Sequence, residues 1–469
     1  MTANFETVLS YFKALTAIPR GSTNRAGIRD YLCSFAAAKG LRYRTDSADN
    51  VVIFKPPAAA YAQAPAVILQ GHTDMVCACA DGCTFDFLHE PLRLRQEGDY
   101  LFAAGTSLGA DDGIGVAMML ALLESDLPLP ALECIFTADE EIGMIGASAL
   151  DMSDMAGKYL INIDSENEGV LTVSCAGGST AVVTLPFTSM EAQAHLYEIE
   201  ISGLRGGHSG MEIDKGGLNA NKLLGDILQR IEAPRLVRME GGEKINAIAR
   251  SAHMCVACAE EIAIEDILKE AKIAVLSIEP QIQITGKYAG FGTVQVMEAA
   301  ASARIITALA AMPQGIIKMS EVDTSAVQTS LNLGIIEQAE AAVSFAFSLR
   351  SNVRAEREAL EQTLQNIARA GGGNMELSGI YPAWEYQKHS ALRDTAVSVF
   401  RRMYGYAPKT ESTHAGLECG VLAAKKEDLE CISLGPQMYD VHTAREKLSI
   451  SSAKRTFEYL VELLGQLGK

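Results

Sequence analysis

The stretch Ala66-Val67-Ile68-Leu69-Gln70-Gly71-His72-Thr73-Asp74 joins an apolar run to a histidine and an aspartate. Four consecutive apolar residues are typical of a buried strand, and the polar pair follows where that strand is expected to end. In open α/β sheets, ligands bind beyond the carboxyl ends of the strands. The stretch therefore predicts an α/β fold with a mostly parallel sheet and a site at that edge.

Four further motifs carry acidic residues or a histidine. They are Gly109-Ala110-Asp111-Asp112-Gly113, Asp139-Glu140-Glu141, Ile163-Asp164-Ser165-Glu166 and Tyr439-Asp440-Val441-His442. Apolar runs precede the second and third of these motifs, and the fourth follows the run Cys431–Leu434 after a short loop. Two imidazoles and several carboxylates gathered on one sheet edge indicate a metal site, and hence a metal-dependent hydrolase.

The bulk properties restrict the class of protein. A chain of 469 residues is too long for one ordinary core, so two domains are expected. The formal net charge of −18 argues against nucleic acid or an anionic membrane as a partner. No apolar run reaches the ~20 residues of a membrane span. The segment Met1–Glu6 lacks the basic and apolar parts of a signal peptide, so we expect a cytoplasmic protein.

The ten cysteines are expected to be reduced thiols. Cys77, Cys79 and Cys83 lie close together in sequence, as do Cys255 and Cys258. Neither group has a second Cys-x-x-Cys motif or a histidine pair nearby, so neither indicates a zinc site of its own.

Changes in local pattern divide the chain into three parts. Helix and strand signals alternate over residues 1–180, and the same pattern returns over residues 382–469, which holds His442. Between them, residues 181–381 alternate strands with amphipathic helices, an order that could reflect a duplicated α+β unit. We therefore expect one catalytic domain in two parts, with residues 181–381 as an inserted α+β domain.

The residue types suit a site with two metal ions. Zinc binds histidine nitrogen and carboxylate oxygen, and one carboxylate, from Asp111 or Asp112, can bridge two ions ~3.5–4 Å apart. Of the neighbours Glu140 and Glu141, one can bind metal while the other accepts a proton from water. Asp74, two residues after His72 on an extended segment, can reach the second imidazole nitrogen and fix its tautomer.

The ordered set of motifs resembles the M20 metallopeptidases, and within them the aminoacyl-histidine dipeptidase (Xaa-His dipeptidase, carnosinase-like) branch. Further matching segments cover nearly the whole chain. They are Gly146-Ala147, Leu160–Glu166, Cys175–Gly178, Gly206–Gly210, Asn219–Leu223, Ile245–Ile248 and His414–Gly420. The cluster Cys77, Cys79 and Cys83 departs from the family pattern, since close relatives tend to be polar there.

The resemblance implies a set of metal ligands. His72, Asp111 and Asp164 would hold one zinc ion, and Asp111, Glu141 and His442 the other, with Asp111 bridging. Each subunit would thus carry two zinc ions, although Mn²⁺ or Co²⁺ suits the same oxygen and nitrogen ligands. The family also places a cis peptide bond after the bridging aspartate.

The resemblance also implies that residues 181–381 are a lid and dimerisation domain, and it implies catalytic and substrate-binding residues. Glu140 matches the general base, and Asp74 the residue that orients the first histidine. His208 matches a lid histidine that enters the site of a partner subunit and stabilises the oxyanion, which implies a homodimer. Asn246 and Arg350 match lid residues that bind the substrate backbone and carboxylate, and Gly416 lies in the matching segment His414–Gly420 and is expected to contact substrate.

The identity of one residue narrows the expected substrate. In this family, aspartate at the position of Asp164 accompanies dipeptidases and aminopeptidases, whereas glutamate accompanies carboxypeptidases and N-deacylases. We therefore expect a dipeptidase for Xaa-His and related dipeptides. An N-deacylase or carboxypeptidase with the same fold is the first alternative, and a non-catalytic binding relative the second.

Overall fold

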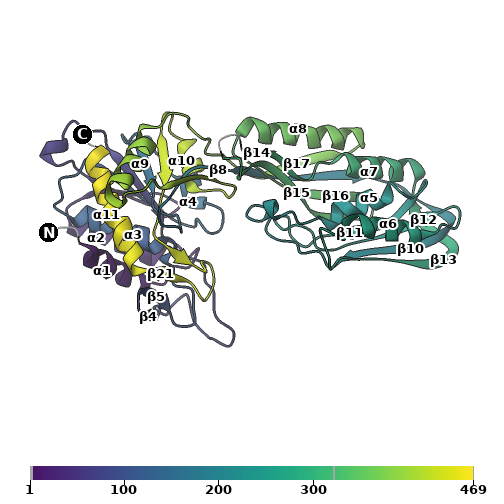
Figure 1. Ribbon diagram of the computed structural model, residues 1–469, viewed down its shortest axis with the longest axis horizontal. Coiled ribbons are helices and arrows are strands. Elements are labelled where there is room, and N and C mark those ends of the chain that lie inside the picture. The colour runs from purple at the N-terminus through teal and green to yellow at the C-terminus, as the bar shows by residue number, and fades with distance from the viewer. Residues whose placement is uncertain (1–3, 321–322, 468–469) are drawn as a thin grey trace. The chain divides into compact units, whose positions relative to one another are not determined.

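The computed structural model describes residues 4–320 and 323–467, which form two compact units (Figure 1). The first unit comprises the described parts of Met1–Cys175, Tyr386–Ser412 and Leu417–Lys469. The second comprises Ala176–Glu385 and Thr413–Gly416. The first unit is therefore built from three separate stretches of the chain, and we describe each unit by itself.

An eight-stranded sheet forms the centre of the first unit, with the strand order β1-β2-β6-β3-β7-β19-β8-β18. The strands are β1 (Arg42–Thr45), β2 (Val51–Lys55), β3 (Val67–His72), β6 (Leu132–Thr137), β7 (Tyr159–Asn162), β8 (Val170–Cys175), β18 (Lys409–Thr413) and β19 (Glu430–Ser433). The neighbours β6, β3, β7 and β19 pair in parallel, whereas the pairs β1–β2, β2–β6 and β19–β8 are antiparallel. The carboxyl ends of the four central strands therefore share one edge.

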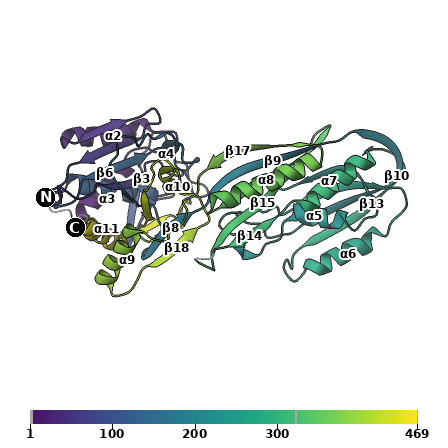
Figure 2. The ribbon, with the colours of Figure 1, turned by 90° about the horizontal axis from the view of Figure 1, so that it is seen from above.

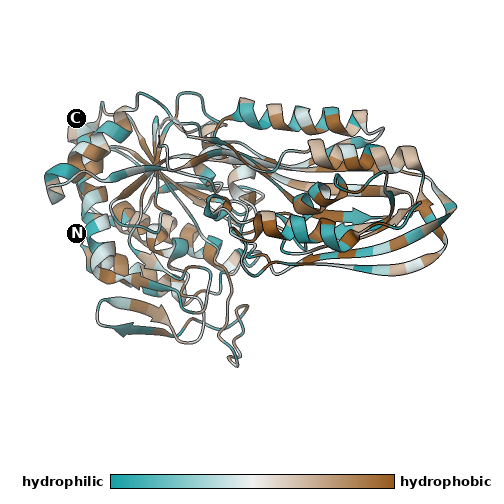
Figure 3. Ribbon diagram, turned by 45° about the vertical axis from the view of Figure 1, so that its right-hand side comes forward, coloured by the Kyte–Doolittle hydropathy of each residue, from teal (hydrophilic) through white to brown (hydrophobic). Residues whose placement is uncertain are grey.

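Helices pack around this sheet. They are α1 (Phe5–Thr16), α2 (Ala26–Ala38), η1 (Ala59–Tyr61), α3 (Ala110–Glu124), α4 (Ile145–Ala149), α9 (Ala391–Tyr404), α10 (Glu418–Ala423) and α11 (Ile450–Leu467). Every residue of α3 up to Leu123 is buried, as its all-round apolar sequence predicts. The central strands are also apolar and buried, and Figure 3 shows them largely brown.

A small four-stranded sheet lies in the same unit. It has the order β20-β21-β5-β4, with β4 (Leu94–Glu97), β5 (Tyr100–Ala103), β20 (Met438–Tyr439) and β21 (Lys447–Ser449). The loop between β20 and β21 carries His442, whose φ of 63° is left-handed. The sequence pattern did not predict this sheet, since its strands are only two to four residues long.

The second unit contains a nine-stranded sheet, in which β14 pairs with β15 beside the main order β13-β10-β12-β11-β15-β16-β9-β17. The strands are β9 (Gly177–Pro186), β10 (Ser189–Ser202), β11 (Arg235–Gly241), β12 (Ala252–Cys258), β13 (Gln283–Met297), β14 (Gly315–Met319), β15 (Val327–Gln338), β16 (Ala342–Ser351) and β17 (Asn374–Tyr381). The helices are η2 (Ile213–Lys215), α5 (Ala220–Leu228), α6 (Ile264–Val275), α7 (Ala299–Ala311) and α8 (Arg354–Ala370), of which α5, α7 and α8 lie across the sheet in Figure 2.

The second unit repeats one topology. If β10, β11, β12 and β13 are numbered 1 to 4, their order in the sheet is 4-1-3-2, with α5 and α6 in the connections. The strands β9, β15, β16 and β17 have the same order, with α7 and α8 as the helices. Both halves are thus split β-α-β-β-α-β arrangements, and the first is inserted between β9 and α7 of the second. The predicted α/β fold with an inserted α+β domain is confirmed.

No helix within residues 4–320 and 323–467 is long and apolar enough to cross a membrane. None of the ten cysteines, all of which are described residues, forms a disulfide.

Candidate metal and catalytic site

Three strand ends bring the predicted ligands of the first unit together. His72 is the last residue of β3, Glu140 and Glu141 follow β6, and Asp164 follows β7. Because β6 and β7 both pair in parallel with β3, these polar residues emerge at the same sheet edge. The other two residues come from elsewhere, with Asp111 near the start of α3 and His442 after β20.

Asp111 belongs to two groups of side chains that could each hold a metal ion. In the first group, His72 Nε2 lies 2.8 Å from Asp111 Oδ1 and 3.4 Å from Asp164 Oδ1. In the second, His442 Nε2 lies 3.0 Å from Asp111 Oδ2 and 2.9 Å from Glu141 Oε1. The ligand atoms within each group are all within 4.8 Å of one another. The two oxygens of Asp111 thus face different histidines.

Asp112 occupies a different environment from Asp111. It is fully buried, belongs to neither group, and accepts a hydrogen bond of 3.2 Å from the backbone of Gly115. A Cβ atom at Gly71 would lie 2.1 Å from Asp112 Oδ2, so a larger residue at position 71 would displace the Asp112 carboxylate. Of the two aspartates that the spacing left open, the geometry favours Asp111 as the bridge. The peptide bond between them is cis.

Asp74 orients both His72 and the turn that carries the two glutamates. His72 Nδ1 lies 3.2 Å from the carbonyl oxygen and 3.5 Å from Oδ1 of Asp74, so Nδ1 donates its proton toward Asp74 and Nε2 faces Asp111. The Asp74 carboxylate also accepts the backbone N–H groups of Glu140 (3.0 Å) and Glu141 (3.3 Å). Burial alone would raise the pKa of Asp74, but bonds from His72, Ser22 and Glu140 lower it to about 2.

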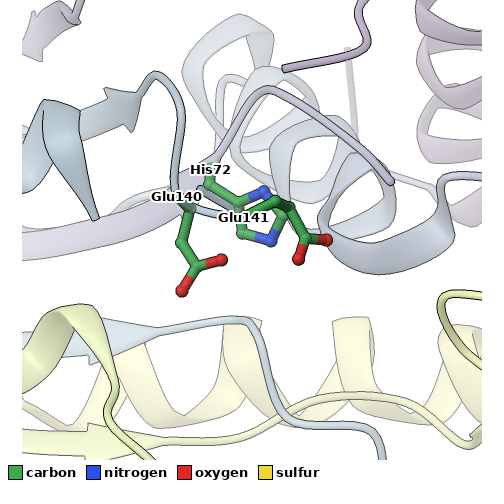
Figure 4. A group of neighbouring side chains, drawn as sticks. All are labelled: His72, Glu140 and Glu141. Atoms are coloured by element: carbon green, nitrogen blue, oxygen red, sulfur yellow. The ribbon is translucent and has the colours of Figure 1, made fainter. Parts of the chain in front are cut away.

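Glu140 and Glu141 point in different directions, as Figure 4 shows. Glu141 contacts His442, whereas no hydrogen bond to the Glu140 carboxylate is found among the described residues. Burial, together with the carboxylates of Asp164 and Glu141, raises the pKa of Glu140 to about 8, although His72 opposes the shift. Together with His72, the two glutamates also form a third group that could hold a metal ion, with all ligand atoms within 4.8 Å of one another, so position alone does not decide which glutamate binds metal.

The charge balance of the site fits cations. Burial raises the pKa of Asp164 to about 8, and hydrogen bonds to Asp111 and Glu141 raise the pKa of His442 to about 11. Without a cation, these groups therefore share protons to offset carboxylates that are out of water. Two imidazole nitrogens and three carboxylates, with no thiol, form a donor set that suits Zn²⁺, Mn²⁺ or Co²⁺.

His208 lies in the second unit, in a glycine-rich loop after β10. Its Nδ1 accepts the backbone N–H groups of Gly210 and Met211, each at 3.2 Å. The imidazole is thereby held in the tautomer that carries its proton on Nε2. Burial and the nearby Arg350 also lower the pKa of His208, which favours the neutral ring. His208 therefore presents one N–H donor.

The other predicted lid residues are neighbours of this loop. Ser209 donates its backbone N–H to the carbonyl of Asn246 at 2.9 Å, and a Cβ atom on Gly210 would lie 2.9 Å from the Arg350 guanidinium carbon. Arg350 donates to the hydroxyl of Tyr381 at 3.2 Å and to the carbonyl of His414, two residues before Gly416, at 3.5 Å. Its buried Nε has no hydrogen-bond partner among the described residues. The second unit thus gathers His208, Asn246, Arg350 and the Gly416 segment.

The sequence pattern missed several buried polar residues of the first unit. Glu418 accepts hydrogen bonds from Gln70 and from Thr137 (2.8 Å) beneath the strand ends, and it does fall in the quoted segment His414–Gly420. Arg20 and Glu446 bind the segments around His72 and Asp111. Their partners are backbone groups, which no residue pattern reveals.

Comparisons with known proteins indicate one family. Residues 68–466 match Peptidase family M20/M25/M40. The chain is 31% identical over 468 residues to the cytosol non-specific dipeptidase of Escherichia coli (strain K12), covering 97% of this chain and 96% of that one. It superposes on the aminoacylhistidine dipeptidase of Vibrio alginolyticus with a TM-score of 0.91 and 33% identity, covering 98% and 96%. An aminopeptidase from Bacillus cereus shares the fold, with a TM-score of 0.57, 16% identity and 99% of each chain covered.

Proposed function

Because the chain belongs to Peptidase family M20/M25/M40, we propose that it is a cytoplasmic two-zinc dipeptidase for Xaa-His and related dipeptides. The observation that carries the proposal is the pair of ligand groups that share Asp111. The names of the Escherichia coli and Vibrio alginolyticus relatives support a dipeptide substrate, and the former also supports the cytosol as location.

The residues divide into those that hold metal and those that handle substrate. His72, Asp111 and Asp164 would hold one zinc ion, and Asp111, Glu141 and His442 the other. When bound, the two ions would polarise the scissile carbonyl and make a water molecule more acidic. Asp74 keeps His72 in the tautomer that such binding requires, because its oxygens lie on the Nδ1 side of the ring.

Glu140 is the general base. Its carboxylate accepts the proton of the attacking water and later donates it to the leaving amine. In the metal-free site, burial is the main cause that raises the pKa of Glu140 to about 8. Such a pKa suits a group that must hold a proton during part of the reaction. The bonds from the backbone of Glu140 and Glu141 to Asp74 keep this carboxylate directed away from that of Glu141.

The lid residues bind the rest of the substrate. His208, with its proton on Nε2, donates to the oxygen that becomes negative as the peptide bond is attacked. Arg350 binds the C-terminal carboxylate with its planar guanidinium, which suits the unpartnered, buried Nε. Asn246 and Gly416 contact the substrate backbone beside it.

The proposed substrate polarity can be tested with blocked dipeptides. A free amine near the metal ions and a carboxylate on Arg350 are both required, so Xaa-His dipeptides should be cleaved, and their N-acetylated or C-amidated forms should be poor substrates. The measurement is kcat/KM for a free dipeptide and its two blocked forms. Faster turnover of N-acetyl amino acids than of free dipeptides would instead favour an N-deacylase.

We further propose a homodimer in which His208 of one subunit completes the site of the other. His208→Ala and Glu140→Ala homodimers should each be nearly inactive. In their heterodimer, one site has both residues and its twin has neither, so roughly half of full activity should return. The two variants are co-expressed with different tags, and the doubly purified heterodimer is assayed.

The control for this experiment is His195→Ala, which removes a histidine of the same unit that contacts Tyr288. It should stay active as a homodimer. No activity in a heterodimer whose mass is confirmed would place His208 in its own subunit's site or outside catalysis.

A further inference from the structure

The segment Leu108–Asp111, which carries the shared aspartate, is bound along its backbone by Glu446. Glu446 Oε2 accepts the N–H groups of Leu108 (2.7 Å) and Gly109 (2.9 Å). Its Oε1 accepts those of Ala110 (2.7 Å) and Asp111 (3.4 Å). Four consecutive N–H groups therefore converge on one carboxylate, which is only 2% exposed. Such charge-assisted bonds are among the stronger hydrogen bonds in proteins.

Arg20 binds the same segment through a carbonyl group. Arg20 as a whole is also only 2% exposed. Its guanidinium donates to the carbonyl of Gly109. It donates as well to the carbonyls of Thr73 (2.9 Å) and Asp74 (3.0 Å), which directly follow His72. Cβ atoms on Gly109 and Gly113 would lie 2.6 and 2.4 Å from Arg20 Nη2. These two glycines thus leave room for the guanidinium, and Arg20 fills it.

Together the two residues connect the three segments that supply His72, Asp111 and His442. Arg20 joins the end of β3 to the Asp111 segment. Glu446 joins the Asp111 segment to the loop that carries His442, which lies four residues before Glu446 in the chain. Within that loop, the backbone N–H of Glu446 donates to the carbonyl of Thr443 at 3.1 Å. Neither side chain faces the ligand atoms themselves, since their bonds are to backbone groups.

We propose that Arg20 and Glu446 are positioning residues of the metal centre. They fix the backbone of the Asp111 segment so that the two carboxylate oxygens of Asp111 face His72 and His442 at the same time. This inference rests on the proposed function, because it needs the two ions. A group that holds a ligand in place typically changes metal affinity or activity 10–100-fold when it is replaced.

The test compares Glu446→Gln and Arg20→Lys with matched buried residues. Glutamine has one acceptor oxygen, so two of the four N–H groups lose their partner; lysine keeps the charge of arginine but not its planar fork. Glu133→Gln is the control for Glu446, because buried Glu133 likewise accepts two backbone N–H groups, from Ala156 (2.9 Å) and Gly157 (3.0 Å), but at the start of β6.

Arg357→Lys is the control for Arg20. Arg357 is buried in the second unit and donates to the carbonyl of Gly178 at 3.0 Å. For every variant, zinc affinity is measured by competition with a chromophoric chelator, and the geometry of the site by the visible spectrum of the Co²⁺-loaded protein. Elemental analysis of the wild type comes first, since fewer than two ions per chain there would refute the proposed function rather than this inference.

We expect Glu446→Gln and Arg20→Lys to weaken binding of at least one ion by roughly 10–100-fold and to alter the Co²⁺ spectrum. The two controls should lose thermal stability without either change. Folded variants at positions 20 and 446 with wild-type affinity and spectrum would overturn the inference.

If Glu446→Gln does not fold, Glu446→Asp serves, because aspartate keeps the charge but is shorter by one methylene group. Folding of the variants only in the presence of zinc would support the inference. Failure to fold with or without zinc would overturn it and leave a purely structural role.

Discussion

Replacing Glu140 by glutamine is expected to lower kcat by roughly 10²–10⁴-fold while both metal ions stay bound. Glutamine has nearly the shape of glutamate but cannot accept the proton of the attacking water. The proposed function gives this role to Glu140 because its carboxylate points away from that of Glu141 and accepts no hydrogen bond among the described residues. The measurements are kcat and KM under saturating zinc, with metal content by elemental analysis.

Glu141→Gln is the matched control, since the same change one residue later should weaken the binding of one metal ion. Glu141 lies 2.9 Å from His442 in the second ligand group. Its lost activity should return in part with excess zinc, whereas that of Glu140→Gln should not. A Glu140→Gln protein with near wild-type kcat would show that another group is the base.

Removal of the metal ions should abolish activity altogether. The holoprotein should contain about two divalent ions per chain, because two ligand groups share Asp111. Dialysis against a chelator should give an inactive protein, and titration with zinc should restore activity as the second equivalent is added. An active protein without bound metal would refute the proposed mechanism.

The pKa values give this experiment a pH dependence. Without metal, burial raises the pKa of Asp164 to about 8, and bonds to Asp111 and Glu141 raise that of His442 to about 11. Zinc must displace these protons, so zinc affinity should rise between about pH 6 and 8, by up to about tenfold per pH unit for each proton released.

The same shifts fix the sign of the stability change. A group whose folded pKa is raised contributes stability that is present below its unfolded pKa and is lost as pH rises through the folded value. The melting temperature of the metal-free protein should therefore fall as pH rises from about 5 towards 8. The zinc-loaded protein should show a smaller decrease, because zinc replaces the protons.

The sequence predicted the side chains that meet at strand ends but not those that bind backbone. His72, Glu140 and Asp164 could be found because each follows an apolar run, and parallel neighbours end at the same edge. The small sheet that carries His442 could not, since strands as short as Met438–Tyr439 have no periodicity. Spacing also left open whether Asp111 or Asp112 bridges the two ions, and only their contacts distinguish the two residues.

The repeated topology of the second unit was only partly visible in the sequence. The alternation of strands and helices suggested a duplicated α+β unit, yet no repeated residues support one. The reason is physical, because burial patterns rather than particular side chains define such elements. In α8, for example, Leu360, Leu364 and Ala368 form the buried stripe, and other apolar residues would serve as well.

The insertion of one half of that unit into the other makes it a self-contained cassette. Its first and last strand residues, Ser189 and Met297, are paired neighbours, and the adjoining Thr188 and Glu298 share a backbone hydrogen bond of 2.9 Å. A module that enters and leaves its host at one point can be gained or lost without rethreading the rest of the chain. His208 and Asn246 lie within the cassette, whereas Arg350 and all five metal-binding candidates lie outside it. Evolution could therefore exchange His208 and Asn246, which we propose to meet the substrate, while the proposed metal ligands stayed unchanged.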